Sequence, residues 1–545
     1  MASLTPYLAL PLAAAGLAAA AAYVNGKYHI AKDIDALYRQ KVGQRNFERE
    51  VRAGRINYWL VFDEQINRRP NEDCIWTPTR TYSWSKTRQM SLQYANWFLE
   101  RGVRRGEFVA FFMQNSAEFM FGWLGLLAIG AAPAMVNFNL TGGALTHCTK
   151  VSEARIMLVD EELQDRVWGN DSLEGLGMEI FVLDEQLKGS LAAAEAKPVP
   201  KSVTDAIDIT APAALRFTSG TTGFPKAVRA PVARVFAFVY GKFSRMGLNP
   251  GDRWYVCMPL CHATAGSTVV VSLLLGVTLC IVKKFSVTNF WEEVRDSRST
   301  ALIYVGEVPR YLLTNPPSPD DKNHHVRMMY GNGMRPEVWK TFRDRFGIQI
   351  IHEMFGASEA MMTFINEVRG DYLVGTIAHH GLILRNWYHN LYVPITIDHE
   401  TGEVVRDPAT GLVKRSSYAR GGEATQAVPD KSAFVGYYQN PEATEKKFLR
   451  DVLRKGDIFY RTGDSLRRDD DGRWYFQDRL GDTFRWKSEN VSTAEVSEAL
   501  GRFPGVIDAN VYGALIPGHE GRAGCAALLI DPAVAKTFKL SELLR

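Results

Sequence analysis

Short apolar runs alternate with helical patterns between roughly residues 100 and 310. The runs read FVAFFM, ARIMLVD, MEIFVLD, RWYVCMP and ALIYVG. Strands that are buried on both faces read as continuous apolar runs, because neither face of the sheet meets water. This rhythm predicts an α/β architecture with largely buried strands.

The segment RPEVWKTFRDRFG carries a clear helical pattern. Pro336 suits the first position of a helix, where its missing N–H costs nothing, and Gly347 suits the end. Three aromatic or branched residues between them fall on one helical face: Val338, Phe342 and Phe346. The spacing therefore predicts a helix over residues 336–346.

Polar residues mark three further elements near the C-terminal end. Asn440 is predicted to cap a helix that begins at Pro441, because its side chain can accept from the first free N–H groups. The Asp471–Gly472 pair between two apolar runs predicts a β-hairpin. Residues 492–495, which run from serine to glutamate, predict a capping box at the start of another helix.

The chain begins with an uncharged and almost wholly apolar stretch, Tyr7–Tyr23. Its 17 residues lie at the short end for a membrane-spanning helix. A signal peptide, an anchor and a peripheral hydrophobic tail all fit, but no basic start typical of a signal peptide is present. We expect an N-terminal anchor over residues 1–26.

Residues 27–55 form a basic juxtamembrane segment with eight Lys/Arg against four Asp/Glu. By the positive-inside rule, the rest of the chain would face the cytosol. Ile30, Ile34 and Leu37 share one helical face, which suits either a membrane-surface helix or an ordinary docking helix. The apolar run Val269–Val282 is too short to span a membrane and is predicted to be a buried strand or helix.

Length and composition narrow the class of protein. A chain of 545 residues is too long for one ordinary core, so two or more domains are expected. A net charge of +4 from 64 basic and 60 acidic residues is too balanced for a nucleic-acid-binding protein. Six scattered cysteines form no CxxC pair, which favours a reducing compartment; small buried residues explain Cys257, Cys261 and His262 better than a metal site does.

Candidate chemistry begins at Arg216–Val228, which reads RFTSGTTGFPKAV. The glycines allow backbone N–H groups to turn inward, the hydroxyls donate, and Lys226 adds positive charge, so the loop is suited to phosphate. It is not a Walker A motif, because Phe224 and Pro225 separate Gly223 from the lysine. Alone, such a run would more often be a flexible linker.

Three later stretches supply the context that the loop lacks: HEMFGASEA, YRTGD and DRLGDTFRWKSENVSTAEV. In this order and spacing they resemble the adenylate-forming superfamily. The segments YGNGMRPEVW, GYYQNPEATEKKFLRDVLRKGDIFYRTGD and DTFRWKSENVSTAEV narrow the resemblance. The chain is similar to the very-long-chain acyl-CoA synthetase and fatty acid transport protein family from roughly residue 50 to its end.

The resemblance implies a role for particular residues. The β- and γ-phosphates of ATP would be cradled by Thr218, Ser219, Gly220, Thr221, Thr222, Gly223 and Lys226. The rest of the nucleotide site would comprise Gly331, Asn332 and Phe355 at the adenine, Ser358 at the α-phosphate, and Asp464 with Arg479 at the ribose, with Gly356 as a further nucleotide-binding residue. Glu359 would hold Mg²⁺, a hard cation that prefers oxygen ligands. Thr221, Lys226, His262, Glu359 and Arg479 form the expected catalytic set, with His262 gating the acyl carboxylate or serving as an ordinary core histidine.

The same resemblance implies the domain organisation. A large AMP-binding domain of layered α/β subdomains would cover residues 56–479, with a hinge at 480–482 and a small α+β lid at 483–545. The lid is expected to be truncated, and neither Lys536 nor Lys539 suits the superfamily's catalytic lysine. Lys487 and Ser488 are candidates for lining the CoA tunnel, although the family usually has glycine at the position of Ser488.

The sequence thus predicts an ATP- and Mg²⁺-dependent ligase that joins a long or very long fatty acid to CoA, coupled to fatty acid uptake. Two alternatives stay open: a catalytically impaired relative that binds or transports fatty acids, and a ligase for a non-lipid carboxylate. The expected partners are a fatty acid, ATP, CoA and a membrane, with no nucleic acid. A membrane-associated, cytosol-facing protein fits the endoplasmic reticulum, peroxisome, lipid droplet or plasma membrane equally.

Overall fold

The computed structural model describes residues 5–218, 224–242, 246–398, 402–431, 434–480, 484–486, 489–491, 493–516 and 522–543. The chain divides into two compact units. We call Val42–Val374 with Lys431–Lys446 the large unit. The small unit comprises Met1–Lys41, Gly375–Asp430 and Lys447–Arg545.

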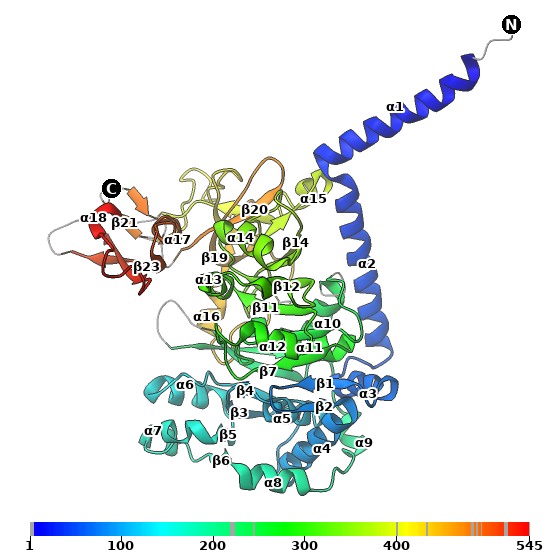
Figure 1. The fold of residues 1–545 in the computed structure, drawn as a ribbon, viewed down its shortest axis with the longest axis vertical. Helices are drawn as coiled ribbons and strands as arrows, with labels where there is room; N and C mark the ends of the chain where they lie inside the picture. The colour runs from blue at the N-terminus through cyan, green and yellow to red at the C-terminus, as the bar shows by residue number, and fades with distance from the viewer. Residues whose placement is uncertain are drawn as a thin grey trace. The chain divides into compact units, whose positions relative to one another are not determined.

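An eight-stranded sheet forms one layer of the large unit, in the order β14-β13-β12-β11-β9-β10-β1-β2 (Figure 1). Its strands are β1 Asp73–Trp76, β2 Thr81–Ser83, β9 Arg253–Val256, β10 Thr278–Ile281, β11 Ala301–Val305, β12 Met328–Asn332, β13 Ile350–Phe355 and β14 Phe364–Val368. Only the outermost pairs, β1–β2 and β13–β14, are antiparallel. The parallel centre brings the carboxyl ends of β11, β12 and β13 to one edge, where ligands of α/β sheets commonly bind.

A six-stranded sheet forms a second layer of the large unit, in the order β6-β5-β3-β4-β7-β8. Its strands are β3 Phe108–Phe112, β4 Ala132–Met135, β5 Ile156–Asp160, β6 Glu179–Leu183, β7 Pro212–Thr218 and β8 Lys226–Pro231. All neighbours are parallel except β7 and β8, which form an antiparallel edge. All five apolar runs noted in the sequence form strands of these two sheets, so the predicted α/β architecture is confirmed.

Helices cover the sheets of the large unit. They are α3 Tyr58–Arg68, α4 Trp84–Glu100, α5 Ala117–Ala128, α6 Gly142–Ser152, α7 Asp171–Glu174, α8 Glu185–Ala193, α9 Lys201–Thr204, α10 Val232–Gly241, α11 Ala263–Leu275, α12 Phe290–Asp296, α13 Glu307–Thr314, α14 Pro336–Phe346 and α16 Pro441–Glu445, with short 3₁₀ turns at Glu161–Arg166 and Pro319–Lys322. The run Val269–Val282 divides between α11 and β10. Gly276 makes the turn between them with a φ of 71°, a conformation that glycine adopts at little cost.

The predicted helix over residues 336–346 is confirmed as α14, which buries Val338, Phe342 and Phe346. Asn440 caps α16, as predicted, by accepting a hydrogen bond from the N–H of Ala443. The predicted capping box involves Ser492, which lies outside the described residues.

A six-stranded antiparallel sheet is the main layer of the small unit, in the order β15-β20-β19-β17-β16, with β18 paired to β19. Its strands are β15 Ala378–His379, β16 Tyr392–Ile395, β17 Gly422–Ala427, β18 Phe448–Arg450, β19 Ile458–Arg468 and β20 Arg473–Arg479. The hairpin predicted at Asp471–Gly472 is confirmed, because it joins β19 to β20. The remaining elements are α15 Leu382–Trp387, α17 Thr493–Gly501, α18 Leu540–Leu543, and the strand pairs β21 Phe484–Trp486 with β22 Glu489–Val491 and β23 Val506–Leu515 with β24 Arg522–Ile530.

The apolar N-terminal stretch forms the 24-residue helix α1, Thr5–Tyr28 (Figure 1). None of the helices within the described residues combines the length and the hydropathy that crossing a membrane requires. The anchor expected over residues 1–26 stays a prediction.

Helix α2, Ile30–Arg52, follows directly, and its start docks onto the small unit. The Asp33 carboxylate is fully buried and accepts hydrogen bonds from the N–H groups of Gly381 (2.7 Å) and Leu384 (2.9 Å). Beside it, the Lys32 ammonium lies 2.7 Å from Nδ1 of His379. Burial and the nearby cation Lys32 lower the pKa of His379 to about 3, so this ring is neutral and accepts the bond. The start of α2 is therefore a docking helix.

We expect Asp33→Ala to destabilise the small unit by about 1–3 kcal/mol, because two buried N–H groups lose their acceptor. The apparent Tm of the variant should fall, and limited proteolysis should cut the N-terminal segment faster. Asp35→Ala is the matched control, since Asp35 lies on the same helix but is exposed and pairs only with Arg39. Equal stability of the two variants would contradict this account of the docking.

Candidate active site

The two ends of the predicted phosphate loop lie side by side in the large unit. β7 ends at Thr218 and β8 begins at Lys226, and these two residues pair in the antiparallel ladder. Oγ1 of Thr218 also donates to the Lys226 carbonyl at 3.4 Å. The loop residues Ser219, Gly220, Thr221, Thr222 and Gly223 lie outside the described residues.

Lys226 and Glu359 are joined through Tyr437. The Lys226 ammonium lies 5.2 Å from the centre of the Tyr437 ring, and the Tyr437 hydroxyl donates to Oε1 of Glu359 at 2.8 Å. Glu359 is buried, with 5% of its surface exposed. Two residues that are 133 positions apart in the chain thus meet at one aromatic side chain.

Tyr437 was not among the residues predicted from the sequence. It lies in GYYQNPEATEKKF, a segment that contributed to the family resemblance. Nothing in the spacing shows which of its two tyrosines faces Glu359, so only the folded chain identifies the residue.

Two of the residues predicted to line the adenine pocket, Gly331 and Asn332, lie at the end of β12. Gly331 sits where any side chain would collide, because a Cβ atom would lie 2.1 Å from the carbonyl oxygen of Tyr304. Asn332 follows, and its Oδ1 accepts a hydrogen bond from Thr264 Oγ1 at 3.3 Å. His262 precedes α11 as its N-cap and is exposed. The hydrogen bond from Thr264 therefore brings the start of α11, with His262, to the end of β12.

Phe355, Gly356 and Ser358 lie at the end of the neighbouring strand β13. The Phe355 ring is buried and packs against Phe364, with centroids 6.1 Å apart. Gly356 is exposed and Ser358 is half-buried. Because β12 and β13 are parallel neighbours, the predicted adenine and α-phosphate residues share one edge of the sheet.

Glu353 is a second residue that the sequence reading did not single out. It lies on β13, is 3% exposed, and accepts hydrogen bonds from the Gly333 N–H (2.5 Å) and the Tyr304 hydroxyl. It thereby holds the backbone that follows Gly331 and Asn332. Burial raises the pKa of Glu353 to about 8, since the charged form loses its hydration.

This raised pKa predicts that stability falls as the pH rises. The unfolded chain releases the Glu353 proton near its ordinary value of 4.5, whereas the folded chain holds it until about pH 8. The contribution of Glu353 to the free energy of unfolding is therefore fully present below pH 4.5. It declines by about 1.4 kcal/mol per pH unit as the pH rises from there to about 8. Glu353→Gln should flatten the decline in Tm between pH 5 and 8, and an unchanged pH profile would contradict the assignment.

The predicted ribose residues belong to the small unit. Asp464 on β19 pairs with Arg479 on β20 in the antiparallel ladder, and Arg479 is exposed. The turn before Asp464 is held by the buried carboxylate of Glu423, which pairs with Arg461 (2.6 Å) and accepts from the Gly463 N–H (3.2 Å). In the predicted hinge, Gly481 and Asp482 lie outside the described residues, as do Lys487 and Ser488.

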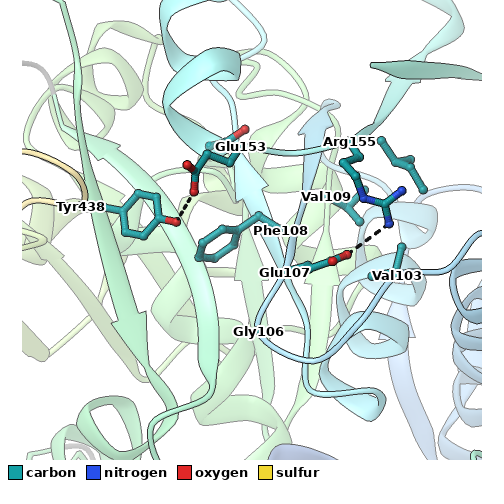
Figure 2. Close-up of a pocket in the computed structure, with 10 residues that line it drawn as sticks. Val103, Gly106, Glu107, Phe108, Val109, Glu153, Arg155 and Tyr438 are labelled. Carbon is teal, nitrogen blue, oxygen red and sulfur yellow. Dashed lines mark hydrogen bonds and ion pairs between the residues drawn. The ribbon is translucent and has the colours of Figure 1, made fainter. Parts of the chain in front are cut away.

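A surface pocket of about 200 Å³ lies elsewhere on the large unit (Figure 2). Figure 2 shows Tyr438 donating to Glu153 at 2.8 Å, and Arg155 paired with Glu107 at 3.3 Å. The pocket is lined by Val103, Gly106, Glu107, Phe108, Val109, Ser152, Glu153, Arg155, Ile156 and Tyr438. None of the predicted site residues lines it, so we assign the pocket no part in the chemistry.

Residues 62–413 match the protein family that is described as AMP-binding enzyme. Isopenicillin N epimerase component 1 of Hapsidospora chrysogena is 41% identical over 99% of this chain and 85% of its own length. The very long-chain fatty acid transport protein of Cochliobolus heterostrophus is 39% identical over 95% of this chain and 81% of its own.

Among solved structures, a benzoate CoA ligase from Burkholderia xenovorans has the same fold. The TM-score is 0.72 at 20% identity, and the match covers 90% of this chain and 91% of the ligase. The chain therefore belongs to the AMP-binding enzyme family, among the relatives that include the very long-chain fatty acid transport proteins and acyl-CoA synthetases.

Proposed function

We propose that this protein activates a long- or very-long-chain fatty acid as its CoA thioester, with an acyl-adenylate as the intermediate, and that this activation is coupled to fatty acid uptake. The main support for this proposal is that Lys226 and Glu359 both contact Tyr437. Lys226 also pairs with Thr218 at the two ends of the predicted phosphate loop. This arrangement brings a cation and a carboxylate to the same tyrosine side chain, and binding a metal–triphosphate requires groups of both kinds.

The proposed chemistry has two steps. An oxygen of the acyl carboxylate attacks the α-phosphorus of ATP, and the bond from that phosphorus to the bridging oxygen breaks, releasing pyrophosphate. The thiolate of CoA then attacks the acyl carbonyl, and AMP leaves with the electron pair of the broken C–O bond. The carboxylate by itself has only an oxide as its leaving group, which departs poorly. The first step gives the acyl group AMP as a good leaving group, and this is the reason that ATP is consumed.

The large unit would hold the triphosphate. Thr218, the loop that follows it and Lys226 would neutralise the β- and γ-phosphates as pyrophosphate departs. Glu359 offers carboxylate oxygens, which suit Mg²⁺, and that ion would supply further charge neutralisation. Ser358 would donate to the α-phosphate, and His262 at the start of α11 would border the acyl carboxylate.

The remaining predicted residues would bind the adenosine and CoA. Gly331, Asn332 and Phe355 would line the adenine pocket, and Gly356 would let the backbone approach the nucleotide. In the small unit, Asp464 would accept hydrogen bonds from both ribose hydroxyls, with Arg479 in support. Lys487 and Ser488 would line the path of the CoA pantetheine, and residues 480–482 would serve as the hinge.

A second candidate is a ligase for a non-lipid carboxylate. It is favoured by one observation, the relative named isopenicillin N epimerase component 1, which is 41% identical over 99% of this chain. The same site residues would serve both candidates, since adenylation chemistry does not depend on the remainder of the acid. The acyl specificity separates them.

We further propose that the protein acts at the cytosolic side of a membrane surface. The support is the composition of residues 27–55, where eight basic side chains stand against four acidic ones. Anionic lipid headgroups attract such a segment without any transmembrane helix.

The test is fatty-acid-dependent ATP–pyrophosphate exchange by the full chain, with monocarboxylic acids from medium to very long chain length. Exchange that requires the acid would support adenylation, and the rank order of acids would separate the two candidates. Absence of exchange with every acid, alongside measurable ATP binding, would contradict the proposal and favour a non-catalytic relative.

A further inference from the structure

Arg216 is a half-buried charged residue of the large unit, on β7 two positions before Thr218. Its guanidinium reaches the first turns of α11. Nη2 and Nε lie 3.1 Å and 3.5 Å from the point where a Cβ of Gly266 would be. The absence of a side chain at Gly266 therefore makes room for this guanidinium, and a larger residue there would push it aside.

No acidic side chain neutralises Arg216 within the described residues. Its Nε is buried and has no hydrogen-bond partner within the described residues. The charged side chain that affects the pKa of Arg216 is a second cation, Arg234. Burial and this repulsion lower the pKa of Arg216 to about 10, yet it stays protonated at neutral pH. Arg234 itself donates to the carbonyl of Ala360 at 2.8 Å, next to Glu359. A cation with a buried, unpaired Nε and no counter-charge is costly, so the site favours an anion from outside the chain.

Tyr58, the first residue of α3, supplies a second donor at the same place. Its side chain is 2% exposed, and its hydroxyl has no partner among the residues that the structure describes. The hydroxyl interacts electrostatically with Arg216, and burial raises the pKa of Tyr58 well above its ordinary value, so it keeps its proton. The Arg216 Nε and the Tyr58 hydroxyl are thus two donors that have no acceptor within the described chain and that interact electrostatically.

The location relates this donor pair to the acyl substrate. Cys261 is another electrostatic neighbour of Arg216, and it directly precedes His262, the residue expected to border the reacting carboxylate. Arg216 lies about 7 Å along β7 from Thr218, on the side away from the phosphate loop. An anion held by Arg216 and Tyr58 is therefore displaced from the phosphates into the interior of the large unit.

We propose that Arg216 and Tyr58 form a subsite for a second anionic group of the acyl substrate, so that the preferred fatty acid is one that carries a second, ω-carboxylate. The inference rests on the proposed adenylation for its setting and defines the substrate class of that same site. A monocarboxylic chain would lay methylene groups against an uncompensated cation, whereas an ω-carboxylate would neutralise it.

The test compares binding with catalysis, so that the two proposals fail separately. Equilibrium binding of α,ω-dicarboxylic acids from C6 to C16 is measured by calorimetry beside monocarboxylic acids of equal carbon number, and exchange is measured with the same acids. The variants are Arg216→Met and Tyr58→Phe. Arg229→Met is the control, because Arg229 lies on the adjacent strand β8 and donates to the Thr210 carbonyl.

We expect wild-type protein to bind one dicarboxylic acid at least tenfold more tightly than its monocarboxylic counterpart. Arg216→Met should lower the ratio of dicarboxylic to monocarboxylic affinity by about 10- to 100-fold, which would remove or reverse the preference. Tyr58→Phe should lower this ratio less, and Arg229→Met should leave it unchanged. This pattern supports the subsite even if exchange is absent, which would overturn only the adenylation proposal.

Three results would overturn the subsite. The first is equal binding of both acid classes by wild-type protein. The second is an equal loss for both classes in Arg216→Met, which would place the reacting carboxylate at the arginine. The third is a loss confined to ATP affinity, which would place a phosphate there.

Discussion

Glu359→Gln is expected to lower ATP–pyrophosphate exchange by roughly 100- to 1,000-fold. The change keeps the size of the side chain and an oxygen that can accept from the Tyr437 hydroxyl, a contact of 2.8 Å in the native protein. It removes the negative charge that would hold Mg²⁺ beside the triphosphate. The loss should therefore appear mainly in the maximal rate and should shrink as the magnesium concentration rises.

Tyr437→Phe is the comparison that separates charge from packing. It deletes the hydrogen bond to Glu359 but keeps the ring under the Lys226 ammonium. We expect a loss of about tenfold or less, since one neutral hydrogen bond is removed. If Glu359→Gln retained wild-type exchange at every magnesium concentration, the assignment of Glu359 would be refuted.

Lys226→Met is expected to lower exchange by about 100-fold or more and to raise the KM for ATP. The methionine preserves the apolar contact with the Tyr437 ring but carries no charge for the departing pyrophosphate. The defect should be visible with every acid, because the phosphates are common to all of them.

Lys283→Met provides the matched control for loss of a lysine charge. Lys283 is half-exposed and pairs with Glu162, away from the predicted site residues. Its exchange should match that of wild-type protein. Comparable losses in both lysine variants would show that general destabilisation, rather than phosphate binding, explains the effect.

The sequence predicted the strands of the large unit well because they are buried on both faces. Runs such as FVAFFM and ALIYVG have no polar alternation, and they form β3 and β11. Helix α14 was equally readable, because Pro336 and Gly347 mark its ends and three apolar residues share a face. Local rules are sufficient where burial and backbone geometry agree.

The N-terminal segment shows where local patterns leave a choice open. The following helix had two open interpretations, and the buried Asp33 decided for docking. The partners of Asp33 lie about 350 residues away, so no periodicity near the helix could reveal them.

By itself, the sequence determined the α/β class and the family, since these depend on local patterns and motif order. Only the tertiary structure decided which side chains meet: Tyr437 between Lys226 and Glu359, Glu353 beside the backbone that follows β12, and Tyr58 near Arg216. The physical reason is that hydrogen bonds and charges act over a few ångströms in space. Residues far apart in the chain come that close only when the sheets assemble.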